Sequence, residues 1–214
     1  MADPTLTLRS LPLFPLATVL FPGGLLPLRV FEVRYLDMVR SCHRIDAPFG
    51  VVALAQGREV RTPGAPPEQL QPVGTLARIT TLAQPQPGLL MVQCRGEQRF
   101  RIDHPSQLKH GLWVADVTLL PHDVALPVPE DLRHAARALQ QVHANLRLRS
   151  PDAAPPVPDD GAYDDCAWVA NRWCELLPLP GVTRQSLMSL DNPLLRLELV
   201  ADMLSKTGID APPA

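Results

Sequence analysis

Cysteine and histidine are the residues of this chain best suited to nucleophilic or metal chemistry. Cys42 and His43 are the nearest pairing of a nucleophile with a base. Neighbouring residues of a helix point about 100° apart, so the thiol and the imidazole would not face each other. We therefore expect Cys42 to pack in the interior and His43 to be solvated, and we predict no catalytic residue from this pair.

Motifs that hold metals, nucleotides or activated nucleophiles are missing from the sequence. H-E-x-x-H, G-x-S-x-G and G-x-G-x-x-G do not occur, and neither Lys109 nor Lys206 follows a glycine as a phosphate-binding loop requires. The histidines share no ligand spacing with one another or with the cysteines. They are His43, His104, His110, His122, His134 and His143. We expect no metal, no cofactor and no enzymatic activity, and interpret His143, on an apolar helical stripe, as a core residue.

Three polar residues at the start of a predicted helix are candidates for contact with a partner. Glu32 in a first helical turn complements the helix dipole, and Tyr35 can bury its ring while presenting its hydroxyl group. With Arg34 between them, they suit either a structural role or contact with a ligand or peptide. The aromatic side chains of Phe14 and Trp113 are expected to lie in the core.

Arginines on one predicted strand form a second candidate surface. Arg95, Arg99 and Arg101 are separated by four and then two positions. Because both separations are even numbers, a regular strand would place all three on one face. Such a face could bind an acidic segment or phosphate groups. A solvated strand surface explains the pattern equally well.

The composition is that of a folded globular protein. The chain has 214 residues, 46% of them hydrophobic and 20% charged, and its formal net charge is -2. That balance argues against general attraction to nucleic acid or to an anionic membrane. The uncharged stretch 10–28 is interrupted by prolines and glycines and is not expected to form a membrane helix. Four cysteines without a C-x-x-C pair favour thiols in the core and a cytoplasmic location.

Strand signals dominate the first 122 residues. Six or more short strands in one region must close into a barrel or pack as a sandwich to cover their edges. The predicted strands are 25–30, 49–56, 73–82, 89–95, 98–103 and 112–120, with further strand and turn within 10–28. A helix is predicted over 31–42, where an apolar stripe suits the end of a barrel, and a long loop over 58–72.

From about residue 129 the apolar period changes to that of helices. Helices are predicted from 129 to about 149, from 163 to 177, from 183 to 190 and from 193 to about 206, with Asn192 as the N-cap of the last. The proline-rich segment 150–161 is expected to be a flexible loop. The predicted fold class is therefore α+β, with a barrel domain over 1–122 and a helical-bundle domain over 123–214.

A series of motifs runs along the chain. The first are L-P-L-F-P-L at 11–16, V-L-F-P-G at 19–23, L-P-L at 26–28 and F-E-V-R-Y at 31–35. They are followed by V-G-T-L-A-R-I at 73–79, R-G-E-Q-R-F-R-I at 95–102 and helical segments at 171–190 and 192–204. In order and separation these motifs resemble the Lon N-terminal domain family, the substrate-binding region of the ATP-dependent Lon protease.

The resemblance implies a pseudo-barrel related to the PUA fold, followed by a helical bundle. The sequence ends after the helical part and includes neither an ATPase nor a serine-lysine protease module. We therefore expect a stand-alone member of the family, without proteolysis or ATP hydrolysis.

Together these observations predict a non-catalytic interaction module or adaptor that binds exposed polypeptide segments of other proteins. An apolar groove, or addition of a strand to a sheet edge, would hold such segments. Self-association is left open. Two alternatives remain, which are RNA binding through the arginines, as PUA-type barrels occur in RNA-modifying proteins, and a small-ligand site in the barrel mouth or the bundle cleft. The net charge of -2 argues against RNA.

Overall fold

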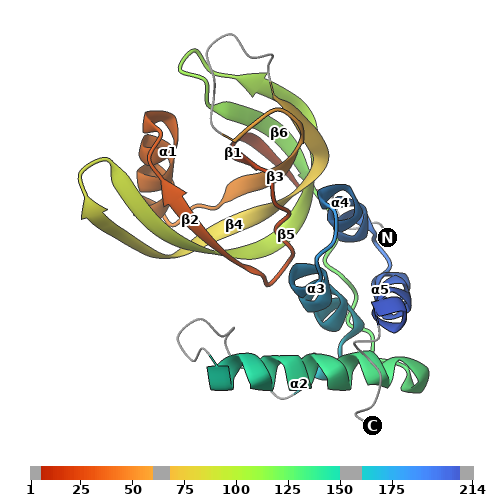
Figure 1. Ribbon diagram of the computed structural model, residues 1–214. Coiled ribbons are helices and arrows are strands. Elements are labelled where there is room, and N and C mark those ends of the chain that lie inside the picture. The colour runs from red at the N-terminus through yellow and green to blue at the C-terminus, as the bar shows by residue number, and fades with distance from the viewer. Residues whose placement is uncertain (1–5, 60–67, 150–160, 208–214) are drawn as a thin grey trace. The chain divides into compact units, whose positions relative to one another are not determined.

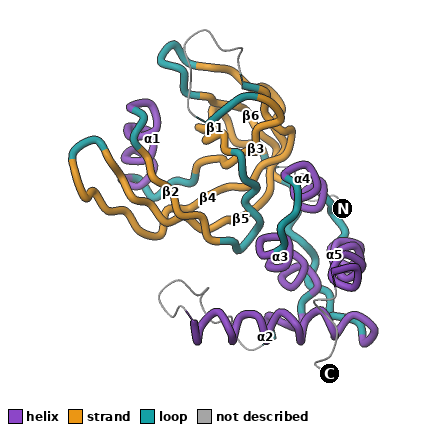
Figure 2. Tube along the Cα trace, viewed as in Figure 1, coloured by secondary structure: helices purple, strands orange, loops and turns teal. Residues whose placement is uncertain are grey.

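The computed structural model describes residues 6–59, 68–149 and 161–207. The chain forms two compact units, Met1–His122 and Asp123–Ala214. In the described residues the first unit contains six strands and one α-helix, and the second is built of helices (Figures 1 and 2). The predicted α+β class, with strands preceding helices, is confirmed.

The first unit contains six strands and one helix in its described residues. They are β1 Thr7–Leu16, β2 Leu25–Val30, α1 Val33–Arg44, β3 Phe49–Gln56, β4 Gln69–Gln86, β5 Leu89–Gln107 and β6 Trp113–Leu119. The bounds of β2 and β3 are those predicted. β5 is one continuous strand where two were predicted, and β4 begins at Gln69, inside the predicted loop. The part of that loop from 60 to 67 lies outside the described residues.

Five of these strands close into a barrel. β5 pairs with β4, β4 with β3, β3 with β1, β1 with β6, and β6 returns to β5. The β1–β3 pair is parallel and the others are antiparallel. β2 lies outside this ring, because it pairs with residues 90–95 of β5 and, among the described residues, with no other strand. The outer edge of β2 is therefore open as far as the described strands are concerned.

The barrel interior is filled by side chains. The ring of Phe100 lies over the backbones of Gly50 and Gly74: a Cβ atom would lie 2.7 Å from its Cζ atom at residue 50, and 2.6 Å from it at residue 74. Leu13, Val52 and other buried apolar residues complete this cluster. The V-G-T and R-F motifs therefore meet in the barrel, where only a glycine fits beneath the aromatic ring.

A glycine also joins the turn before β2 to β5. The Gly23 N–H donates to the Gly96 carbonyl at 2.8 Å, and the Gly96 N–H donates to the Gly24 carbonyl at 2.8 Å. A Cβ atom at Gly96 would clash with the Phe21 carbonyl oxygen. The Thr75 hydroxyl donates to the Leu20 carbonyl at 2.6 Å. These bonds hold the start of β2 in place.

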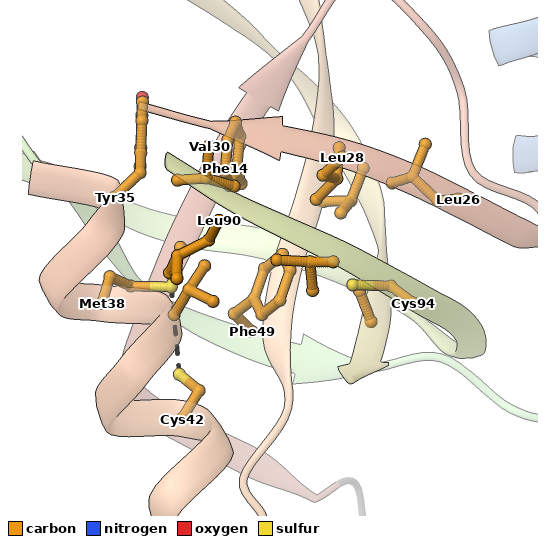
Figure 3. Packing of buried hydrophobic residues seen from close by; sticks show 14 of the residues in the cluster. Phe14, Leu26, Leu28, Val30, Tyr35, Met38, Cys42, Phe49, Leu90 and Cys94 are labelled. Carbon is orange, nitrogen blue, oxygen red and sulfur yellow. Dashed lines mark hydrogen bonds between the residues drawn. The ribbon is translucent and has the colours of Figure 1, made fainter. Parts of the chain in front are cut away.

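A second apolar cluster lies between the sheet and α1. Tyr35, Met38, Val39 and Cys42 form the buried face of α1, as the predicted stripe requires. Figure 3 shows this face against Phe49 and Leu90 of the sheet. The helix begins at Val33, two residues later than predicted, so Phe31 precedes it and is 55% exposed instead of packed.

The second unit is described by itself. Its main elements are the helices α2 Arg133–Arg149, α3 Cys166–Leu176, α4 Gly181–Ser189 and α5 Pro193–Thr207, with short 3-10 turns η1 Glu130–Leu132 and η2 Ala162–Asp164. Asn192 caps α5 as predicted, since its Oδ1 accepts from the Leu194 and Leu195 N–H groups at 3.0 and 3.2 Å. Residues 150–160 of the predicted flexible loop lie outside the described residues.

Arg196 on α5 links the parts of this unit. Its side chain is 1% exposed and pairs with Asp123 at 2.6 Å. It also donates to the Asn171 side chain at 2.9 Å and to the Leu187 carbonyl at 3.0 Å. One buried guanidinium thus connects α3, α4 and α5 to the residue that opens the unit.

None of the helices in the described ranges is both long enough and apolar enough to cross a membrane.

Candidate functional site

A groove of about 410 Å³ follows the open edge of β2. Its lining includes every residue from Leu26 to Glu32 and none from β5, so it lies on the side of β2 that has no partner strand. We call this hollow the β2 groove. Its apolar lining consists of Phe14, Leu16, Leu26, Leu28, Val30 and Phe31. The volume is within the range of roughly 300–1,000 Å³ that is typical of ligand sites.

The alternation of β2 creates the floor of this groove. Leu26, Leu28 and Val30 are buried, whereas the residues between them are exposed. Successive side chains of a strand point to opposite faces, so the three apolar residues lie in a row on one face. In Figure 3 this row leads to Phe14 and Tyr35 beside Val30.

Tyr35 places a polar group in this apolar site. Its side chain is 3% exposed and lines the groove. No described residue is hydrogen-bonded to its hydroxyl group. Burial is the main reason that the pKa of Tyr35 is raised to about 12, with Arg34 acting in the opposite direction. At neutral pH the group is therefore an uncharged phenol, able to donate and to accept a hydrogen bond.

Glu32 and Arg34 lie beside Tyr35, so the structure brings this predicted trio together. The Arg34 guanidinium pairs with Glu32 Oε2 at 3.0 Å and donates to the Gly111 carbonyl at 2.7 Å. It also lies 4.5 Å from the centroid of the Tyr35 ring. Arg34 is buried and bound to backbone, which makes it a positioning residue. Glu32 lines the groove, and its Oε1 has no hydrogen-bond partner among the described residues.

The rim of the groove has one exposed aromatic ring and a second carboxylate. Phe31 lies on the rim with 55% of its surface exposed. Glu59, from the segment after β3, accepts from the Ala17 N–H through Oε1 at 2.6 Å. The other Glu59 oxygen has no hydrogen-bond partner among the described residues. Sequence reasoning missed both residues, because Phe31 was expected to pack on a helix and only the folded chain brings Glu59 to β2.

The predicted arginine face on β5 is wrong. Thr75 pairs with Arg99, but Ala77 pairs with Gly96, so β5 contains one extra residue between these pairs. Such a bulge reverses the face of the residues that follow it. Arg95 therefore lies on the opposite face from Arg99. Arg99 is buried, at 3% exposure, and Arg101 pairs with Asp103 at 3.2 Å.

The cysteines and His143 lie in the interior, whereas His43 is exposed as expected. Cys42 is 6% exposed, and burial raises the pKa of its thiol. His143 is 3% exposed, and its Nδ1 lies 2.9 Å from the Tyr163 hydroxyl. All four cysteines are buried free thiols. Within the described ranges no three His, Cys, Asp or Glu side chains gather as metal ligands would.

Trp113, predicted as core, is half-buried instead. Its indole N–H donates to Glu68 Oε2 at 3.3 Å, beside a smaller hollow of about 340 Å³. The barrel interior itself is occupied by Phe100 and its neighbours.

The comparisons with known proteins agree with this architecture. Residues 10–206 match the ATP-dependent protease La (LON) substrate-binding domain, and the chain belongs to that family. It is 33% identical to a Lon N-terminal domain protein from Xanthomonas campestris, with a TM-score of 0.70 over 91% of this chain and 98% of that one. The N-terminal domain of a Mycobacterium avium complex Lon protease, at 17% identity, shares the fold with a TM-score of 0.59, over 92% and 98% of the two chains.

Curated relatives match over a shorter part of the chain. Lon protease 2 of Myxococcus xanthus is 36% identical over 95 residues, and Lon protease of Anaeromyxobacter dehalogenans (strain 2CP-C) is 33% identical over 93 residues. These alignments cover 44% and 43% of this chain and 11% of each relative. The matched part is thus about a tenth of the length of those proteases.

Proposed function

We propose that the barrel unit binds extended polypeptide segments of other proteins in the β2 groove and performs no covalent chemistry on them. The observation that carries the proposal is the coincidence of an open strand edge, an apolar floor and the hydroxyl of the largely buried Tyr35 in one hollow. Membership of a substrate-binding domain family supports the same role. A segment held in this way could be passed to another protein, which is the task of an adaptor.

The edge of β2 suits addition of a strand. Pro27 has no N–H group, which fits a position whose backbone faces the open edge of a sheet. By the two-residue period of a strand, the backbone groups of Leu25 and Arg29 face the same edge. A partner strand would bond to these groups, while its alternate side chains enter the groove.

The rim supplies the most direct test. Phe31→Ser removes an exposed ring from the groove, and Ile45→Ser, also in the barrel unit and 66% exposed, removes a comparable apolar group outside it. Binding is measured by fluorescence anisotropy with a labelled apolar peptide of about eight residues, which is longer than β2.

We expect Phe31→Ser to weaken binding roughly tenfold or more, since burial of such a side chain contributes about 1.5–3 kcal/mol. Ile45→Ser should leave the affinity unchanged. Equal affinities for the two variants would overturn the assignment of the groove.

The alternatives have less support in the geometry. The RNA-binding alternative depends on Arg95, Arg99 and Arg101 sharing one face of β5. The bulge in β5 places Arg95 on the opposite face from Arg99. A small ligand in the barrel is opposed by the packing of Phe100. The buried free cysteines are consistent with a cytoplasmic protein, which we include in the proposal.

A further inference from the structure

We propose that the β2 groove selects segments in which apolar residues are flanked by basic groups. This inference rests on the proposed function and adds the charge of the bound segment to it. It follows from the positions of two carboxylates, Glu32 and Glu59, which both line the groove together with the Tyr35 hydroxyl.

Both carboxylates retain capacity for a ligand. Glu32 uses Oε2 for Arg34, and Glu59 uses Oε1 for the Ala17 N–H. The remaining oxygen of each has no hydrogen-bond partner in the described parts of the chain. An ionised carboxylate accepts at both oxygens, and charge-assisted bonds from lysine, arginine or an amino terminus are among the stronger ones available.

Of the two carboxylates, Glu32 has part of its charge offset by Arg34, whereas Glu59 has no cationic partner among the described residues. Arg34 is buried, bound to the Gly111 carbonyl and stacked on the Tyr35 ring, so its guanidinium is shielded from a bound segment. Arg29 lines the groove, but it is one of the exposed residues of β2, and alternation directs its side chain to the opposite face from Leu28 and Val30.

The hydroxyl of Tyr35 is a further polar group that a bound segment can reach. A phenol hydroxyl can both donate and accept a hydrogen bond. Tyr35 is 3% exposed and its hydroxyl has no partner among the described residues, yet it faces a hollow that could hold one. A backbone amide or carbonyl of an inserted segment would satisfy it.

The test uses the full chain and three labelled peptides with one apolar centre, flanked by lysine, by serine or by glutamate. We expect the lysine-flanked peptide to bind roughly tenfold more tightly than the glutamate-flanked one, with the serine-flanked peptide between them. Added salt should reduce this difference, because the carboxylates are solvent-facing.

The variant Glu32→Gln/Glu59→Gln should abolish the preference while it retains an amide oxygen for Arg34 and for Ala17 N–H. A matched control, Asp37→Asn/Glu130→Gln, removes two acidic charges outside the groove at side chains that are 75% and 82% exposed. The control should keep the full preference.

The outcomes separate the two proposals. Equal binding of all three peptides, weakened by Phe31→Ser, would overturn the charge preference and leave the groove as the binding site. A preference that the control variant also loses would overturn the role of Glu32 and Glu59. Failure of every peptide to bind would overturn the proposed function together with the inference.

Discussion

Tyr35 of α1 stacks on Phe14 of β1, with ring centroids 4.1 Å apart and planes inclined by 13°. The stack fixes the ring of Tyr35 in the apolar cluster and leaves its hydroxyl group at the β2 groove. The ring of Tyr35 therefore packs in the core, while its hydroxyl group is the polar part that reaches the groove. A substitution that removes the oxygen alone can separate them.

Tyr35→Phe should fold normally and bind peptides less tightly. The ring and its stacking remain, but the hydrogen bond to the bound segment is lost. Since such a bond contributes about 0.5–1.5 kcal/mol, the dissociation constant should rise by a factor of roughly two to ten. Anisotropy titration gives the affinity, and thermal unfolding verifies the fold. Unchanged affinity in a stable variant would show that the hydroxyl does not contact the segment.

Ionisation of Tyr35 makes stability depend on alkaline pH. Burial raises its pKa from 10.0 to about 12 in the folded chain. The contribution of Tyr35 to the free energy of unfolding is therefore complete below pH 10. It is lost as the pH rises from 10 to 12, because Tyr35 ionises in the unfolded chain before it does in the folded one. Urea unfolding across this range should show a declining free energy. The decline should be smaller in Tyr35→Phe, with Tyr163, whose pKa burial also raises, contributing to what remains.

Gly74→Ala should destabilise the barrel severely. Its Cβ atom would lie 2.6 Å from Phe100 Cζ and 2.6 Å from the Val51 carbonyl oxygen. Overpacking of this kind costs about 1–3 kcal/mol or more. Adding Phe100→Leu should restore stability only in part, since the carbonyl contact remains. Gly181→Ala, where the Cβ atom would meet nothing within 4 Å, is the control that urea unfolding should show to be tolerated.

Arg196→Lys should destabilise the helical unit. Lysine cannot reproduce the planar set of bonds from Arg196 to Asp123, Asn171 and the Leu187 carbonyl. Loss of one partner of a buried ion pair costs about 3–5 kcal/mol. Because lysine keeps the positive charge, we expect Arg196→Lys to cost less than that. Arg137→Lys, at an exposed position of α2, serves as the comparison. Equal urea midpoints for the two variants would contradict a structural role for Arg196.

Local patterns were sufficient for much of the fold. The alternation of β2 and the helix-capping residue Asn192 both depend on neighbours in the sequence, and the structure has them where they were predicted. Closure of the barrel through the β5–β6 pair agrees with the general need to cover strand edges. The family motifs have a physical reason as well, since Gly74 and Phe100 meet inside the barrel.

Tertiary features account for what the sequence did not predict. The bulge between Gly96 and Arg99 in β5 depends on pairing with β4 and leaves no sign in the spacing of the arginines. The sequence therefore could not predict that Arg95 and Arg99 lie on opposite faces. The β2 groove joins Phe14, Phe31 and Glu59, which lie on separate segments. Of its residues, only Glu32 and Tyr35 were singled out as partner contacts in advance, because polar residues at a helix start are visible without a fold.

Amide hydrogen exchange of the full chain, with and without a saturating lysine-flanked peptide, tests the central claim most directly. The account predicts slower exchange along β2, at the amides of Leu25 and Arg29 that face the open edge, and little change in the helical unit. Slower exchange confined to the helices, or unchanged exchange along β2 while the peptide is bound, would contradict binding in the β2 groove.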